Sequence, residues 1–302
     1  MLKYLKSYNY LKNTLFVLMA ILCLNSFAQN DSLFKAQTLC NEKKFSQAIK
    51  IIDKVILNSE TDKDPASWHI RAYAYLQSYK QAGSGNTSKV SLLDTAMYST
   101  LKSLKYDSKS EYKENNIAFL KNGAASYYKL CLIILQDSLN PIRSEKFYYE
   151  YKRYTNILNP TLNLSLKDIE YYNAAGGLFG DLYTKNNFKK KYGDFAKTAL
   201  LKVLEIDSKN ISANINLGIL YYNQGATLMR ELDYDAGINQ LEVVQENAKK
   251  LFNQSLPFML MVHKLQPKDA RAIEGIEGIY SALLDEEKAK EFKQKMEALN
   301  KK

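Results

Sequence analysis

The 302-residue sequence is poor in residues that break helices and in residues that build catalytic or metal sites. It contains five prolines, two histidines and three cysteines. The histidines, His69 and His263, stand far apart, and no HExxH or CxxC pattern occurs. A nucleophile paired with a nearby base is equally absent from the sequence pattern. We therefore expect no metal, no cofactor and no enzymatic activity.

Strand patterns are missing too. No segment alternates polar and apolar residues with a period of two between turn residues. Apolar residues instead recur at the 3.6-residue spacing of amphipathic helices along the chain. The sequence predicts an all-α protein, and the abundant tyrosine and phenylalanine are mostly expected in helix–helix contacts.

Concentrated charge is also lacking. Lys and Arg exceed Asp and Glu by 42 to 32, a net charge of +10, but the excess is scattered and Lys189–Lys191 is the longest basic run. A nucleic-acid-binding protein would carry a basic stripe within a recognisable module, so we exclude that class. Lys189–Lys191 is expected in a solvated turn between helices. A weak attraction to an anionic envelope surface stays open.

The N-terminus has the three parts of a secretory signal. Lys3, Lys6 and Lys12 form a basic region without acids, Leu15–Leu24 is an apolar run, and Ala28 ends a stretch with small residues. We expect cleavage after Ala28, so that residues 1–28 are a signal peptide and residues 29–302 form one mature domain. Cleavage of the signal peptide removes three lysines and lowers the net charge from +10 to +7.

This signal predicts export to the periplasm of a Gram-negative bacterium. The alternative is an uncleaved N-terminal helix that keeps the protein membrane-associated, but the apolar run is shorter than the roughly 20 residues needed to span a bilayer. A lipoprotein reading at Cys23 is disfavoured because bulky Ile21 and Leu22 precede it.

A repeated helical hairpin is the main organising pattern of the mature chain. Its best example is Leu217-Gly218-x2-Tyr221, in which a small residue lies between a large apolar residue and a tyrosine. Trp68-x2-Arg71-Ala72-x2-Tyr75 has the same spacing. A small residue at this position lets the second helix of the hairpin pack closely. Anchors recur at Ala36, Ala72, Ala124, about Ala175, Gly218 and Glu277, and predict about six hairpins.

Second helices are marked by further alanines, namely Ala48, Ala96, Ala196 and Ala289. The first two anchors are 36 residues apart and the later ones 43 to 59 residues apart, so the middle repeats are stretched. We attribute the excess to a loop at Gly83–Ser88, to a second helix displaced to about 89–106, and to a long helix over 115–136. The glycines of 176–180 lack a preceding strand and nucleotide-loop spacing, so close helix packing is expected there.

These motifs resemble the tetratricopeptide-repeat (TPR) superfamily. The resemblance covers nearly all of residues 29–302 and implies a TPR-like α-solenoid whose first helices line a concave groove for a peptide or protein segment. Mapping the family's groove positions onto this sequence gives the candidate partner-binding residues His69, Tyr73, Lys121, Tyr128, Lys129, Tyr172, Phe179, Tyr222 and Asn223.

The mapped groove has aromatics, two lysines and little acidic character, which suits a segment with apolar and some acidic side chains. The family's carboxylate clamp is not expected because Ala125 follows Lys121 where asparagine is needed. The resemblance implies a non-catalytic scaffold that binds another envelope protein or peptide segment. The alternative is a glycan or small-ligand module that uses concave-face aromatics.

Cys40 and Cys131 survive the expected cleavage. They fall in the first helices of alternate repeats, about 20 Å apart for helix axes 8–10 Å apart, whereas a disulfide needs Cα atoms within about 7 Å. We expect two free, buried thiols.

Overall fold

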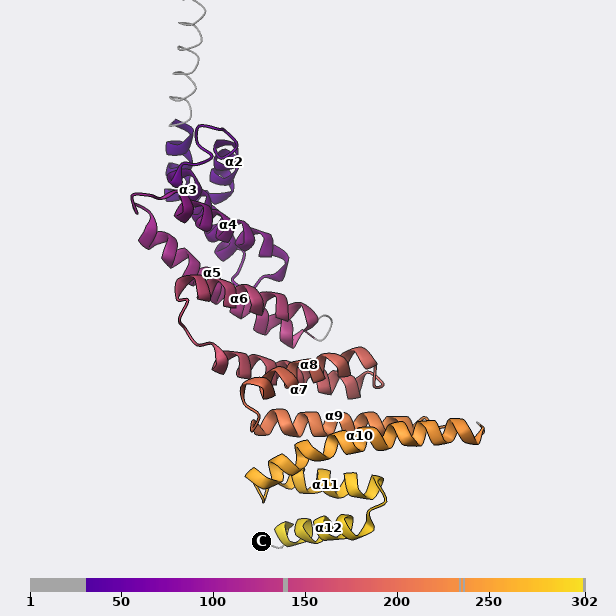
Figure 1. The fold of residues 1–302 in the computed structure, drawn as a ribbon. Helices are drawn as coiled ribbons and strands as arrows, with labels where there is room; N and C mark the ends of the chain where they lie inside the picture. Colours follow the sequence, from indigo (N-terminus) through magenta and orange to yellow (C-terminus); the bar gives the residue numbers. More distant parts are fainter. Residues whose placement is uncertain (1–30, 138–140, 234, 236, 301–302) are drawn as a thin grey trace, which may run out of the picture. The chain divides into compact units, whose positions relative to one another are not determined.

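The computed structural model describes residues 31–137, 141–233, 235 and 237–300 (Figure 1). The expected signal peptide lies outside these residues, so its cleavage stays a prediction. In the described part of the chain, no helix combines the length and apolar content needed to cross a membrane. The chain divides into two compact units, the first ending at Leu162 and the second comprising Asn163–Lys302.

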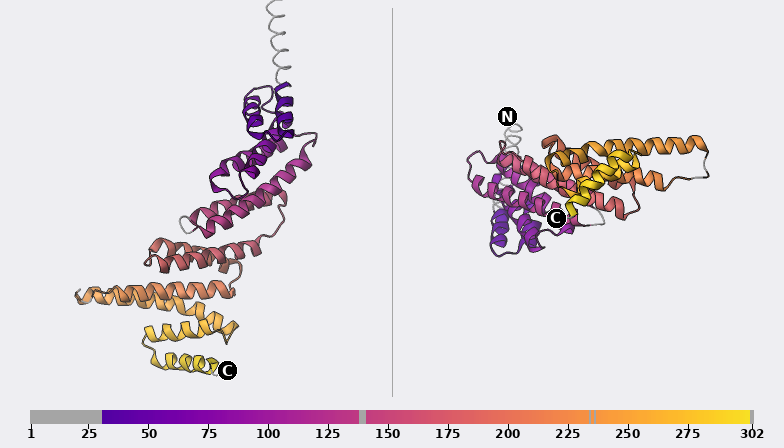
Figure 2. Two further views of the ribbon diagram at one scale, coloured as in Figure 1. Left: turned by 180° about the vertical axis from the view of Figure 1, so that it is seen from behind. Right: turned by 90° about the horizontal axis from the view of Figure 1, so that it is seen from below.

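The described residues of the first unit form three helical hairpins. A helix over residues 31–41 pairs with α2, α3 pairs with α4, and α5 pairs with α6 (Figures 1 and 2). Their bounds are α2 (Phe45–Val55), α3 (Pro65–Gln81), α4 (Val90–Tyr106), α5 (Lys113–Gln136) and α6 (Ser144–Leu158), with short 3-10 helices η1 (Thr87–Lys89) and η2 (Pro141–Arg143) before α4 and α6.

The second unit contains three more hairpins, α7 with α8, α9 with α10, and α11 with α12 (Figures 1 and 2). Their bounds are α7 (Ser165–Lys185), α8 (Lys190–Ile206), α9 (Ile211–Arg230), α10 (Ile238–Leu265), α11 (Ala270–Ala282) and α12 (Glu286–Asn300). All regular structure in the described residues is helical, which confirms the all-α prediction and fits an α-solenoid of paired helices.

The long elements fall where the sequence placed them. The displaced second helix expected at about 89–106 is α4, and the long helix expected over 115–136 is α5. α9 ends at Arg230 and α10 begins at Ile238. With 28 residues, α10 is longer still and holds Pro257 in its interior, where one backbone hydrogen bond is missing.

Three first helices begin at a side-chain cap. Asp64 accepts from the backbone N–H groups of Ala66 and Ser67 at the start of α3, where Pro65 occupies the first helical position. Asn210 caps α9 and Asp269 caps α11 in the same way. Each cap satisfies backbone donors that have no partner inside the helix, so a short polar residue defines where each of these three helices begins.

Small residues lie in the core as predicted. The anchor alanines are buried, from Ala36 and Ala72 at 0% exposure to Ala124 at 5%. Cys40 and Cys131 are buried and free, which confirms the expectation for these thiols. Burial raises the pKa of Cys40 to about 11 and that of Cys131 to about 12, so both stay protonated at neutral pH.

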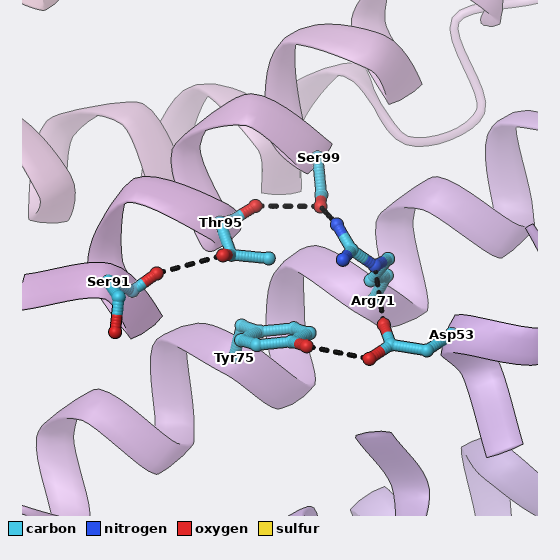
Figure 3. Close-up of polar contacts among 6 residues, drawn as sticks. All are labelled: Asp53, Arg71, Tyr75, Ser91, Thr95 and Ser99. Atoms are coloured by element: carbon cyan, nitrogen blue, oxygen red, sulfur yellow. Dashed lines mark hydrogen bonds and ion pairs between the residues drawn. The ribbon is translucent and has the colours of Figure 1, made fainter. Parts of the chain in front are cut away.

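A polar network joins the first two hairpins (Figure 3). The Arg71 guanidinium donates from Nε to Asp53 Oδ1 and from one Nη to Ser99 Oγ, both at 2.7 Å. The Tyr75 hydroxyl donates to the other Asp53 oxygen at 2.7 Å. Arg71 also lies over the Tyr75 ring, 4.8 Å from its centroid. One arginine of α3 therefore fixes α3 against both α2 and α4.

The structure places the close contact of the fourth hairpin one residue later than expected. A Cβ added to Gly176 would lie 2.5 Å from Leu200 of α8, as one added to Gly218 would lie 2.7 Å from Met259 of α10. Gly176, rather than Ala175, is thus the counterpart of Gly218. The shift by one residue moves every mapped position of α7 around the helix by about 100°.

Candidate functional site

The second unit has a groove on the face formed by its first helices. A cavity of about 400 Å³ lies between α9 and α11, and a smaller one of about 110 Å³ lies between α7 and α9. Ile219 and Asn223 line both cavities, so the two adjoin along α9. We call the two cavities together the α7–α9–α11 groove.

Its floor is apolar along α9. Ile219 is 41% exposed although it is a large aliphatic residue in the middle of a helix. Tyr222 is half-buried, with its ring 5.5 Å from that of Phe252. Most large apolar side chains of a folded protein are buried in its core. Apolar side chains that are exposed inside a depression are therefore typical of a binding site.

Three helix-interior glycines line the groove without a packing reason. A Cβ added to Gly180 would meet nothing within 4 Å, and one added to Gly177 or Gly278 would meet only ordinary contacts at 3.8 and 3.5 Å. Glycine inside a helix costs about 0.5–1 kcal/mol relative to alanine. The expected close packing holds for Gly176 only. Gly177, Gly180 and Gly278 leave the groove open instead.

Two amide side chains offer hydrogen bonds to the groove. Asn216 and Asn223 stand seven residues apart on α9, hence two turns apart on one face. Both line the groove, and neither side-chain amide has a hydrogen-bond partner among the described residues. Each side-chain amide has an NH₂ donor and a C=O acceptor. These groups can bond to the C=O and N–H groups of an extended peptide backbone.

The charged groups of the groove are mainly acidic. Glu274 and Glu277 of α11 and Asp181 of α7 line it, with Arg271 as the basic residue. The Arg271 guanidinium donates to both carboxylate oxygens of Asp269, at 2.7 and 3.2 Å. These hydrogen bonds lower the pKa of Asp269, so the pair stays ionised and the Arg271 charge is balanced.

Four of the predicted site residues belong to the second unit. Two of them line the groove, and the other two lie elsewhere. Tyr222 and Asn223 line the groove. Phe179 is buried against Phe195, with ring centroids 5.4 Å apart. Tyr172 packs beside α8, where the Lys202 ammonium lies 4.6 Å from its ring centroid. Both departures follow from the one-residue shift at Gly176.

In the first unit, His69 and Tyr73 lie together at the junction of α3 and α5. The His69 ring stacks on Phe119 at 5.1 Å, and its Nδ1 is 2.8 Å from Asn116 Oδ1. Tyr73 contacts the same phenylalanine at 6.0 Å. Burial lowers the pKa of His69, so the ring is neutral at neutral pH. Both residues are half-buried contacts between hairpins.

The other predicted residues of the first unit lie along α5. Lys121 and Lys129 are exposed, and Tyr128 is half-buried, 4.9 Å from the ring of Tyr151 on α6. No cavity described in this unit includes any of the three. Their binding role stays a prediction.

Sequence reasoning missed the residues that α11 contributes. Applying the same family positions to the last hairpin, with Glu277 as anchor, gives Arg271, Glu274 and Gly278, and all three line the groove. The Glu277 anchor itself was predicted, but the groove positions that follow from it were not among the candidate residues. Asn216 and Ile219 carry no sequence signal apart from their place on α9.

A cavity of about 220 Å³ in the first unit lies between the second helices α4 and α6. Its buried wall consists of Tyr127, Phe147 and Tyr154, with the Tyr127 and Tyr154 rings stacked at 5.6 Å. The Tyr127 hydroxyl donates to Asp94 Oδ1. Tyr98, which is 52% exposed, stands at the rim.

No group of three or more potential metal ligands occurs within the described ranges. A scan against protein-family models and a search of curated proteins each returned no match to this chain. The case for function therefore rests on the groove and the sequence pattern.

Proposed function

We propose that this chain is a non-catalytic, TPR-like binding scaffold that holds an extended segment of a partner protein in the α7–α9–α11 groove. The observation that carries the proposal is that the two cavities adjoin on α9, where Ile219 and Asn223 line both. Apolar contact comes from Ile219 and Tyr222, and main-chain hydrogen bonds come from Asn216 and Asn223. The expected N-terminal signal makes another cell-envelope protein the partner.

Open glycines support this use of the groove. Gly177 and Gly180 weaken α7 and fill no packing requirement. A bound segment would explain the two glycines, because the absence of Cβ atoms lets another backbone approach the helix closely. The fold would be more stable with alanine at both positions, whereas binding requires glycine.

The test separates these two effects. Linear peptides are first selected against the protein from a random phage-displayed library, and a selected peptide is labelled for fluorescence polarisation. Gly177→Ala with Gly180→Ala should raise the free energy of unfolding by about 0.5–1 kcal/mol per site. The same variant should weaken peptide binding, because the new methyl groups occupy the cavity.

Ala174→Gly is the matched control on the same helix. Ala174 is exposed and does not line the groove, so its change should lower stability by about 0.5–1 kcal/mol and leave binding unaltered. If no linear peptide is selected, or if the double alanine variant binds with unchanged affinity, the groove is not the binding site.

A second candidate function, binding of a glycan or other small polar ligand, has one observation in its favour. The α4–α6 cavity combines stacked aromatic rings with Asp94, Glu150 and Arg153. Aromatic rings with polar groups around them suit a sugar ring. This cavity lies between second helices, whereas the sequence placed the ligand-binding aromatics on the first-helix face.

A thermal-shift screen with monosaccharides and free amino acids tests this candidate. A ligand that stabilises the wild type should lose its effect in Tyr98→Ala, which removes an exposed rim side chain. An unchanged shift in that variant counts against the α4–α6 cavity.

A further inference from the structure

We infer that the segment bound in the α7–α9–α11 groove carries lysine or arginine side chains; this inference rests on the proposed function. The protein as a whole has a net charge of +10. Three carboxylates and one arginine nevertheless line the groove, and the arginine is already paired with Asp269. The local charge is therefore opposite in sign to that of the whole molecule.

The carboxylates are placed to receive cations from one side of an extended chain. Glu274 and Glu277 are three residues apart on α11, so they share a face and lie about 4.5 Å apart along the helix axis. Glu274 is exposed and has no ion-pair or hydrogen-bond partner within the described part of the chain. Glu277 accepts a long hydrogen bond from Ser281 Oγ, at 3.4 Å, and no other hydrogen bond from the residues that the structure describes.

Asp181 adds an acidic group at the other side of the groove, on α7. Asp181 is exposed. Ile219 of α9, which lines both cavities, lies between Asp181 of α7 and the carboxylates of α11. A segment crossing the three helices would thus meet acidic, apolar and again acidic surface. A complementary sequence has apolar residues in its middle and basic residues toward both sides.

This charge pattern departs from the sequence-based expectation of a groove with two lysines and little acidic character. Lys121 and Lys129 belong to α5 in the first unit and are not among the residues that line the groove. The family positions of α11 supply the acids. Opposite charges across an interface steer association and select among partners more than they raise affinity.

The composition of the phage-selected peptides tests the inference directly. We call a peptide groove-dependent if it binds more weakly to the Gly177→Ala, Gly180→Ala double variant than to the wild type. Groove-dependent peptides should contain more Lys and Arg than Asp and Glu. Selection against a Glu274→Lys, Glu277→Lys variant should shift the enrichment toward acidic peptides. Groove-dependent peptides that are neutral or acidic with the wild type would overturn the inference and leave the proposed function intact.

Affinity gives a second readout. For a selected basic peptide, Glu274→Gln with Glu277→Gln should weaken binding about fivefold at low salt, the effect of losing two exposed ion pairs. The loss should shrink as salt screens the charges. Glu242→Gln with Glu246→Gln on α10 is the control, because it makes the same charge change outside the groove and should have no such effect.

An equal loss in the control variant would mean that the peptide responds to overall charge, and this also contradicts the inference. Failure to select any groove-dependent peptide would instead remove the proposed function. The two failures are therefore distinguishable.

Discussion

Single side chains connect neighbouring hairpins in this protein. Arg71 bridges Asp53 and Ser99, and Tyr75 holds the second oxygen of Asp53. The Arg71 side chain is only 13% exposed, so its charge depends on the Asp53 carboxylate for compensation. Removing either partner leaves the other partly buried without its counter-charge.

Tyr75 makes this network sensitive to alkaline pH. Burial, followed by the hydrogen bond to Asp53, raises the pKa of Tyr75 from 10.0 to about 12. A raised folded-state pKa contributes stability below the unfolded pKa, and this contribution is lost as pH rises through the folded value. The Tyr75 contribution should therefore decline between about pH 10 and 12.

Comparison with Tyr75→Phe isolates that contribution, since other tyrosines titrate in both proteins. At neutral pH the variant should lose about 0.5–1.5 kcal/mol, the net value of a hydrogen bond. The difference in free energy of unfolding, measured with urea, should narrow as pH rises from 10 toward 12. A difference that stays constant over this range would contradict the assignment.

At the scale of helices, methionine and glycine determine how the last two hairpins pack. Met259 of α10 is buried between Gly218 of α9 and Gly275 of α11, where added Cβ atoms would lie 2.7 and 3.0 Å from it. The Ser255 hydroxyl donates to the Gly218 carbonyl at 2.7 Å. Helix α10 thus packs closely against α9 at Gly218 and against α11 at Gly275.

Gly218→Leu should be among the most destabilising single changes in the chain. Overpacking a close helix contact costs about 1–3 kcal/mol and sometimes more, against a typical domain stability of about 5–15 kcal/mol. Thermal unfolding followed by circular dichroism measures the effect, with Gly180→Ala as the open-glycine control. A Gly218→Leu melting temperature equal to that of the wild type would refute this packing.

The whole molecule consists of two units that each contain several hairpins and their own buried contacts. In the second, Leu200, Val203, Ala213 and Leu217 form one apolar cluster, and α10, α11 and α12 share another. Contacts between neighbouring hairpins are how a repeat array is stabilised, and a few hairpins are enough to form a core. The single-domain expectation for residues 29–302 stays a prediction.

The fragment 163–302 should fold by itself and keep the groove. We expect cooperative thermal unfolding of the isolated fragment and binding of groove-selected peptides with near wild-type affinity. Circular dichroism and fluorescence polarisation measure the two properties. An unfolded fragment would show that its hairpins need those of the first unit.

Export is the remaining prediction at this scale. Expressed in a Gram-negative host, the protein should fractionate with the periplasm and begin at Gln29, because small residues precede that position. Intact-mass analysis of the recovered protein measures the cleavage site. Retained Met1, or a lipid on Cys23, would contradict it.

Local patterns in the sequence were sufficient for the helices. The loop at Gly83–Ser88, the displaced helix at about 89–106 and the spacing around Gly218 indicated where helices begin, end and pair, since each depends on residues close in the chain. The same patterns could not fix the register of 171–180. Ala175, Gly176 and Gly177 are all small, and only contact with Leu200 distinguishes Gly176.

The sequence by itself thus determined the all-helical class, the number of hairpins and the burial of the small anchors, because helix periodicity and turn residues act locally. Family positions on the sequence pointed to Tyr222 and Asn223, and the tertiary structure decided which other residues form the groove. Gly180, Asn223 and Glu274 come from three different helices, and their proximity depends on how successive hairpins stack. The acidic character of the groove is a property of that stacking, and no single segment of the sequence contains it.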